Sequence, residues 1–176
     1  MDLDKEIIKQ YINKHFPIIY NLSNLCPTFL MGGAIRDLML GLEPKDLDFV
    51  CLDTIGIVDA FVLKYHLTWR KNKFGGYKIY YRNIEIDLWS TNDLFSSIEY
   101  NIDGLFYDVA NNYFLPFGFF DAMDHGLVKL NKNNNTPNIE RMNNRKEQLD
   151  SFLKSFKQEN KKDEYVRKRK KTNIIV

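Results

Sequence analysis

Two aspartates, Asp46 and Asp48, are the residues whose type and spacing most directly suggest chemistry. They begin an apolar run, residues 46–52, whose composition predicts a β-strand. Because strand side chains alternate between faces, both carboxylates project from one side, and Leu47 faces the other. On a helix the two side chains would diverge by about 200°. The pair suits Mg²⁺, which takes hard oxygen ligands such as carboxylates, phosphate oxygens and water.

A third carboxylate is expected from the later strand-like segment 84–89. Alternation places its isoleucines and leucine on one face and Asp87 on the other, together with Glu85. If this strand lies beside the first, Asp87 joins Asp46 and Asp48. Three carboxylates holding two metal ions would activate an acceptor hydroxyl and stabilise a leaving pyrophosphate. We therefore expect these three aspartates to be catalytic residues and ligands of a two-metal Mg²⁺ site, with Mn²⁺ as the alternative ion.

A glycine pair supplies the other half of the expected site. Gly32 and Gly33 follow the short apolar segment 28–31 and precede a helix-like segment. Unhindered backbone N–H groups at a helix start favour phosphate binding. Nearby cations would neutralise phosphate charge, and an aspartate would orient the arginine or the loop. The residues expected to bind nucleotide are Gly32, Gly33, Arg36, Asp37 and Lys45.

The acidic pair and the glycine pair are weak signals when each is taken alone. A single Asp-x-Asp pair more often lies at a solvated strand edge than in a metal site, and a glycine pair is more often only a turn. The combination of a strand, a glycine turn, a helix, the acidic pair and a later acid-bearing strand favours a functional site.

The elements that must position these residues are read from apolar periodicity and turn signals. The pattern predicts an α/β (α+β) protein with a small mixed β-sheet flanked by helices and a C-terminal helix. We expect one domain over residues 1–145 and a charged, helical, basic tail over 146–176. The predicted helices are 3–16, 34–40, 57–66, a turn near Asp121 and one starting at Ile139; the predicted strands are 28–31, 46–52, 67–70, 77–81, 84–89, 104–110 and 113–117, with loops at Arg82-Asn83, Asn111-Asn112 and 131–138.

Composition points to a cytoplasmic protein. The 176 residues are 44% apolar and 27% charged, and no apolar run approaches the roughly 20 residues that span a bilayer. The amino terminus is acidic and lacks the order of a secretory signal, and Cys26 and Cys51 form no CxxC pair. The basic run 167–171 would contact phosphate backbones, or form a solvated, frayed terminus.

The segment GGAIRDLMLGLEPKDLDFV, residues 32–50, resembles the signature of the class II tRNA nucleotidyltransferase and bacterial poly(A) polymerase head domain. That signature reads GG, a small residue, a branched apolar residue, RD, a leucine-rich turn and KD-apolar-DF. The similarity continues weakly to about residue 145. By position, the metal-binding pair corresponds to Asp46 and Asp48, the nucleotide loop to Gly32, Gly33, Arg36 and Asp37, and the third acid to Asp87.

The resemblance implies a nucleotidyltransferase fold, Mg²⁺ dependence, a nucleoside triphosphate donor such as ATP, and an RNA (tRNA-like) 3′ end as acceptor. It implies an enzyme of the polynucleotide adenylyltransferase or tRNA nucleotidyltransferase kind, with residues 1–145 as its head-like domain.

The segment 97–108 departs from the family pattern. Where the family has two arginines followed by DFTIN, both arginines are absent, and Glu99 and Asp103 stand at the aspartate and asparagine positions. The triphosphate and ribose contacts that the family makes there are therefore expected to differ. The stretch after Ile139 is similar to the start of the family's neck helices, with Arg141 and Arg145 as candidate nucleotide contacts.

Counterparts of the family's neck, body and tail domains are not recognised in the chain. We therefore expect a simpler acceptor, a protein partner that supplies acceptor specificity, or a small toxin or defence transferase that modifies RNA or protein. The alternative from another class is a catalytically inactive module that binds nucleic acid or a protein partner.

Overall fold

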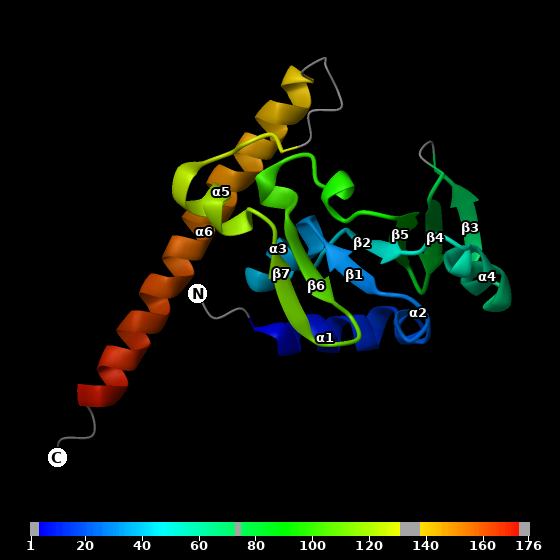
Figure 1. The fold of residues 1–176 in the computed structure, drawn as a ribbon. Coiled ribbons are helices and arrows are strands. Elements are labelled where there is room, and N and C mark those ends of the chain that lie inside the picture. The colour runs from blue at the N-terminus through cyan, green and yellow to red at the C-terminus, as the bar shows by residue number, and fades with distance from the viewer. Residues whose placement is uncertain (1–3, 73–74, 131–137, 173–176) are drawn as a thin grey trace.

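A mixed β-sheet forms the centre of the molecule (Figure 1). The computed structural model describes residues 4–72, 75–130 and 138–172, with side chains up to residue 158. Seven strands in this part of the chain pair in the order β3-β4-β5-β2-β1-β6-β7. They are β1 (Thr28–Met31), β2 (Asp46–Leu52), β3 (Thr68–Lys71), β4 (Tyr77–Tyr81), β5 (Ile84–Thr91), β6 (Leu105–Asp108) and β7 (Tyr113–Pro116).

Helices flank this sheet, as predicted for the fold class (Figure 1). In Figure 1, α1 and α2 lie below the sheet, α4 lies beside β3, and α6 lies at the opposite end of the molecule. The helices are α1 (Lys5–His15), α2 (Ile19–Ser23), α3 (Gly33–Met39), α4 (Ile57–Lys64), α5 (Phe119–His125) and α6 (Ile139–Thr172), with 3₁₀ turns η1 (Phe95–Ser97) and η2 (Asn101–Asp103).

The strand pair β2–β5 is parallel, whereas the other pairs of the described sheet are antiparallel. Its register sets Asp46 opposite Glu85 and Asp48 opposite Asp87. This confirms the expectation that the two acid-bearing strands are neighbours. Since paired residues share a face, all four carboxylates project from the same side of the sheet.

The two faces of the sheet are covered differently. Leu47 and Phe49 belong to a large apolar core that includes α1 and α4. Val50 lies in a smaller core with Leu94 and Ile98, which precede and follow η1. By alternation, Asp46 and Asp48 share the face of Val50. The small core covers that face at Val50 and leaves its acidic end accessible.

The predicted elements correspond closely to those observed. The bounds of β1, β2 and β4 are those predicted, and Arg82 and Asn83 form the β4–β5 turn with positive φ angles of 47° and 69°. Such angles are typical of a type I′ hairpin. The helix predicted at 57–66 ends at Lys64, and the loop predicted at 131–138 lies almost wholly outside the described residues.

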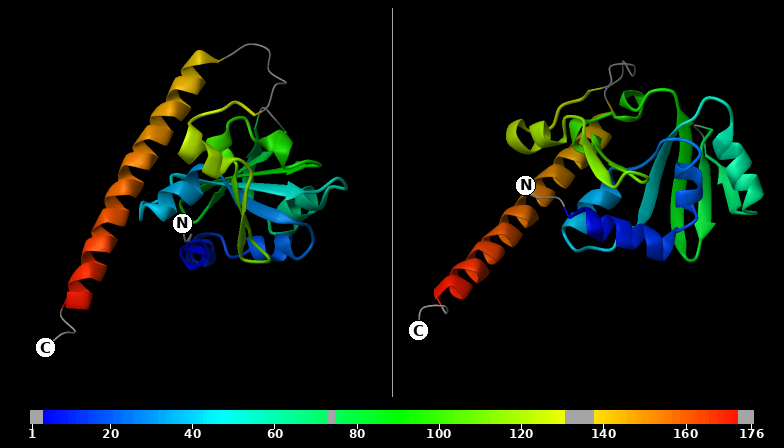
Figure 2. Two further views of the ribbon diagram at one scale, coloured as in Figure 1. Left: turned by 60° about the vertical axis from the view of Figure 1, so that its left-hand side comes forward. Right: turned by 60° about the horizontal axis from the view of Figure 1, so that its bottom comes forward.

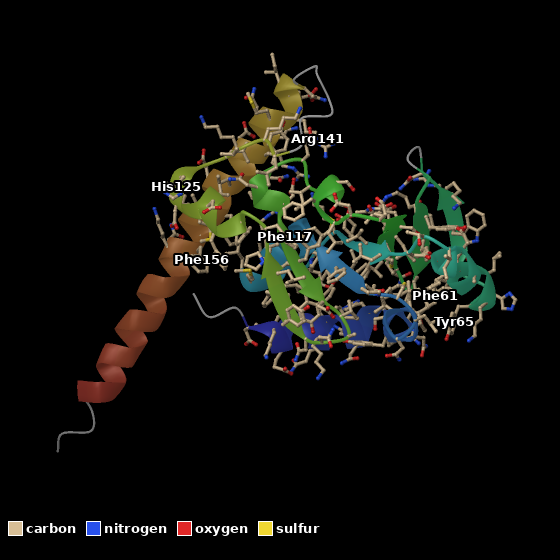
Figure 3. The ribbon with its side chains drawn as sticks, in the orientation of Figure 1. Phe61, Tyr65, Phe117, His125, Arg141 and Phe156 are labelled. Atoms are coloured by element: carbon tan, nitrogen blue, oxygen red, sulfur yellow. The ribbon has the colours of Figure 1, made fainter. Side chains whose placement is uncertain are left out.

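The long helix α6 packs on the body through its first half. Leu149 and Phe152 are buried, and the Phe152 ring lies 5.8 Å from that of Phe119 on α5. Phe156, labelled in Figure 3, stacks on Phe152 at 5.6 Å. Beyond these contacts the helix extends away from the sheet (Figure 2). Among the described residues, no helix combines the length and apolar character needed to cross a membrane.

Candidate active site

One cavity of about 1430 Å³ brings together every residue predicted for the site. Its walls come from the end of β1, from α3, β2, β4 and β5, and from the first half of α6. The predicted residues that line it are Gly32, Gly33, Arg36, Asp37, Lys45, Asp46, Asp48 and Asp87.

A compact group of carboxylates lies at the start of β2 and β5. One oxygen each of Asp46, Glu85 and Asp87 lie within 4.8 Å of one another. Asp48 lies two residues further along β2 than Asp46, opposite Asp87. We call Asp46, Asp48, Glu85 and Asp87 the acid cluster. The three closest carboxylates are thus Asp46, Glu85 and Asp87, whereas the predicted trio was Asp46, Asp48 and Asp87. Strand alternation had placed Glu85 on the same face as Asp87.

The acid cluster is electrostatically strained by its own negative charge. Burial, followed by the charges of Asp46 and Asp87, raises the pKa of Asp48 to about 7. Burial and the charge of Asp87 also raise the pKa of Asp46. Closely spaced carboxylates that resist ionisation are stabilised by a cation. Their hard oxygen donors and close spacing fit Mg²⁺ or Mn²⁺.

Lys78 on β4 partly neutralises the cluster and was not predicted. It lies directly across from Asp87 in the β4–β5 pair. Its Nζ forms ion pairs with Glu85 and, at 3.0 Å, with Oδ2 of Asp87. Burial disfavours the Lys78 ammonium, but the hydrogen bonds to the two carboxylates outweigh it and raise its pKa to about 12. The hydrogen bond from Lys78 to Glu85 lowers the pKa of Glu85.

The glycine turn lies beside the far end of the acid cluster. Gly32 has φ 72° and ψ −129°, a conformation that residues with a Cβ rarely adopt, and Gly33 begins α3. A Cβ built at Gly32 would lie 4.0 Å from Oδ2 of Asp48. The backbone at this turn thus lies against the carboxylate, within the same cavity.

Arg36 projects from α3 into the cavity wall and is 6% exposed. Its Nη1 donates to the Ile102 carbonyl at 2.8 Å and to Oδ1 of Asp103 at 3.4 Å. Burial lowers the pKa of Arg36, and the charge of Asp103 opposes that effect. These hydrogen bonds to η2 orient the guanidinium. The role predicted for Asp37, which is to orient either Arg36 or the loop, stays a prediction.

The two acids that depart from the family pattern face the two candidate arginines of α6. Nε of Arg141 lies 2.6 Å from Oε2 of Glu99, and Nε of Arg145 lies 3.1 Å from Oδ2 of Asp103. Both arginines line the cavity. Figure 3 shows Arg141 near the start of α6. Asp103 therefore joins Arg36 and Arg145, and this ion-pair network fixes α6 along one side of the site.

Comparison with solved structures identifies the fold. A Thermotoga maritima CCA-adding enzyme complexed with tRNA-CCA matches at 18% identity and TM-score 0.57 over 75% of this chain and 36% of its own. A CCA-adding enzyme in complex with CTP matches at 17% identity and TM-score 0.56, over 75% of this chain and 37% of its own. A tRNA-processing enzyme in an apo form matches at 15% identity and TM-score 0.52, over 74% and 38%. The chain has the fold of a nucleotidyltransferase head domain.

The match confirms the fold implied by the resemblance in residues 32–50. No protein-family model and no curated protein matches the sequence. The chain spans little more than a third of the length of the three CCA-adding and tRNA-processing enzymes.

Proposed function

We propose that this chain is a Mg²⁺-dependent nucleotidyltransferase that transfers a nucleoside monophosphate from a nucleoside triphosphate to the 3′ end of an RNA. The observation that carries the proposal is the acid cluster on the parallel pair β2–β5, which shares one cavity with the glycine turn at Gly32. A phosphoryl-transfer site needs grouped hard oxygen donors and a phosphate cradle side by side.

The triphosphate would bind between the glycine turn and the surrounding cations. Backbone N–H groups at Gly33 and the charges of Arg36 and Lys45 would hold its oxygens. Asp46, Asp48, Glu85 and Asp87 would hold the metal. Mg²⁺ bound there would supply positive charge that offsets the negative charge of the transferring phosphoryl group and would lower the pKa of an acceptor hydroxyl.

The reaction follows from this arrangement. The acceptor hydroxyl oxygen bonds to the α-phosphorus, the bond from that phosphorus to the α–β bridging oxygen breaks, and pyrophosphate leaves as the hydroxyl proton passes to water. Arg141 and Arg145 on α6 line the same cavity in ion pairs with Glu99 and Asp103, and we propose them as nucleotide contacts in a chain that lacks the family's paired arginines.

We propose that this chain either recognises a simple RNA acceptor without help or depends on a protein partner for acceptor specificity. The matched structures include complexes with tRNA-CCA and with CTP, which supports a nucleotide donor and an RNA acceptor. Transfer to a protein side chain, as in a toxin or defence transferase, would use the same chemistry with another acceptor. A cytoplasmic location fits an RNA substrate and two free, buried cysteines.

An inactive binding module is the second candidate, and Lys78 is the observation that favours it. Its ammonium already pairs with Glu85 and Asp87, the carboxylates that a metal would need. A thermal-shift titration distinguishes the two candidates. An enzyme should be stabilised by nucleoside triphosphate only when Mg²⁺ is present, since a ligand that binds the folded state raises the midpoint temperature of thermal unfolding.

The transfer itself is tested by incubating the protein with Mg²⁺, each α-labelled nucleoside triphosphate in turn, total RNA and cell protein. The matched control is the Asp46→Asn/Asp48→Asn double variant, which keeps the size of both side chains. Label that moves to RNA only with the intact aspartates supports the proposal. Label on protein alone identifies a protein acceptor, and no transfer with any donor favours the binding module.

A further inference from the structure

A second, shallow groove lies at the other end of the acid cluster from the glycine turn. It has a volume of about 550 Å³ and is lined by Lys45, Tyr80, Arg82, Asn83, Ile84 and Glu85. Glu85 belongs to the acid cluster, and Lys45 lines both the groove and the main cavity. The groove therefore adjoins the proposed reaction centre directly, on the side of Asp46 and Glu85.

The groove offers an exposed aromatic ring beside cations. Tyr80 is 47% exposed and lies across from Glu85 in the β4–β5 pair, so both side chains share the face of the acid cluster. Arg82 occupies the turn that closes the hairpin, is exposed and lines the groove together with Lys45. An aromatic platform flanked by Lys or Arg is typical of surfaces that bind single-stranded nucleic acid.

The position of the groove fits the stereochemistry of the transfer. The attacking and leaving oxygens of phosphoryl transfer lie roughly in line on opposite sides of the phosphorus. The glycine turn lies next to Asp48, whereas the groove lies next to Glu85, the register partner of Asp46. Pyrophosphate held near Gly32 would leave on one side, and an acceptor in the groove would attack from the other.

We propose that this groove binds the 3′-terminal nucleotides of the single-stranded RNA acceptor, an inference that rests on the proposed function. A base near the 3′ end stacks on Tyr80, Lys45 and Arg82 bind the phosphodiesters beside it, and the terminal hydroxyl reaches the acid cluster. Two cations and one ring at the groove complement a phosphate chain with exposed bases.

Binding of a 5′-fluorescein-labelled single-stranded RNA of about 12 nucleotides, followed by anisotropy without nucleoside triphosphate, tests the groove separately from catalysis. The test variants are Tyr80→Ala and Arg82→Gln, the latter chosen because Arg82 has a positive φ that a β-branched residue would not tolerate. Tyr113→Ala is the matched control, since Tyr113 is 43% exposed on the opposite edge strand β7. Thermal unfolding of each variant verifies that it folds.

We expect Tyr80→Ala to weaken RNA binding by roughly tenfold, from the value of one base–aromatic stack. Arg82→Gln should weaken binding and reduce its salt dependence, because one phosphate contact is lost. Tyr113→Ala should bind like the unmodified chain. The same two groove variants should raise the KM for RNA acceptor and leave the KM for nucleoside triphosphate unchanged.

The outcomes separate this inference from the proposed function. RNA binding that is absent in the unmodified chain, or equal in the Tyr80→Ala, Arg82→Gln and Tyr113→Ala variants, overturns the groove as the acceptor site. Groove-dependent RNA binding without any nucleotide transfer would leave the groove standing and overturn the transferase. Transfer to protein that the groove variants do not affect would also overturn the RNA acceptor site.

Discussion

At the scale of single residues, the site is governed by the balance of charge within the acid cluster. Four carboxylates share one face of the sheet, and Lys78 is the cation that contacts two of them among the described residues. Like charges at this spacing raise carboxyl pKa values, whereas an ammonium or a metal ion lowers them. Protonation, Lys78 and metal are therefore alternative ways of neutralising the same group.

Replacing Lys78 by methionine should have opposite effects on stability and on metal binding. Without metal, loss of the ammonium leaves the carboxylates uncompensated and should lower the unfolding free energy by about 1–2 kcal/mol. Removal of a competing positive charge should tighten Mn²⁺ binding roughly tenfold. Urea unfolding and the electron paramagnetic resonance signal of free Mn²⁺ measure the two effects. Lys64→Met on α4 is the control, and unchanged Mn²⁺ affinity in Lys78→Met would contradict the competition.

The raised pKa of Asp48 predicts a pH dependence of stability. Its pKa is 3.8 in the unfolded reference and about 7 in the folded protein, so between these values the folded state binds the extra proton. Stability of the metal-free protein should therefore fall as pH rises from about 4 to about 7. Between pH 5 and pH 8, the free energy of unfolding should decrease by about 2 kcal/mol less in Asp48→Asn than in the unmodified chain. Urea unfolding in the presence of a metal chelator measures this difference. An unchanged pH profile in that variant would refute this reading of Asp48.

At the scale of elements, the parallel pair β2–β5 matters most because it aligns carboxylates that are distant in sequence. Asp53 directly follows strand β2, is 7% exposed and binds backbone N–H groups at the start of α4. Its carboxylate accepts hydrogen bonds from the backbone N–H groups of Ile55, Gly56 and Val58 at 2.9–3.1 Å. This turn connects β2 to the crossover that returns the chain to β5.

Asp53→Ala should therefore destabilise the fold by about 2 kcal/mol, since three backbone donors lose a charged acceptor. Asp53→Asn keeps one acceptor oxygen and should lose less. Burial raises the pKa of Asp53, but the backbone hydrogen bonds outweigh it and lower that pKa. The stabilisation is thus present above the unfolded pKa and lost as pH falls through the folded one. Equal unfolding midpoints for Asp53→Ala and the unmodified chain would exclude the capping role.

The strands and the aspartates of the site could be predicted because each is indicated by a pattern within a short stretch of sequence. Alternation in 46–52 and 84–89 predicts strands with acids on one face, and the resemblance in 32–50 locates the glycine turn. Lys78 could not be assigned, because its partners depend on the β4–β5 register. Helix α2 was missed since its five residues are too short for a 3.6-residue pattern to be recognised. The pairing of Arg141 with Glu99 depends on where α6 packs, which no local pattern specifies.

At the scale of the whole molecule, α6 forms part of the cavity wall and also part of the core. Arg141 and Arg145 line the cavity, and Leu149 and Phe152 are buried against the body. The domain division predicted at residue 145 falls within this helix, between the ion pairs and the apolar contacts, and it stays a prediction.

Two truncated chains test how far the body depends on α6. A chain that ends at residue 145 loses Leu149 and Phe152, and removal of a buried aromatic ring alone costs about 3–5 kcal/mol. It should unfold at a clearly lower denaturant concentration. A chain that ends at residue 158 keeps these contacts and should unfold close to the full chain. A chain of residues 1–145 as stable as the full chain would instead establish residues 1–145 as an independent domain.

We propose that the acid cluster beside the glycine turn catalyses nucleotide transfer. The most direct test is the initial rate of transfer from an α-labelled nucleoside triphosphate to RNA, measured for the unmodified chain, Asp48→Asn and the surface control Asp121→Asn on α5. Loss of a metal-binding carboxylate should lower the rate by about a thousandfold, whereas the control should match the unmodified chain. Transfer by Asp48→Asn at the unmodified rate, or no transfer by the unmodified chain, would contradict a catalytic role of the acid cluster.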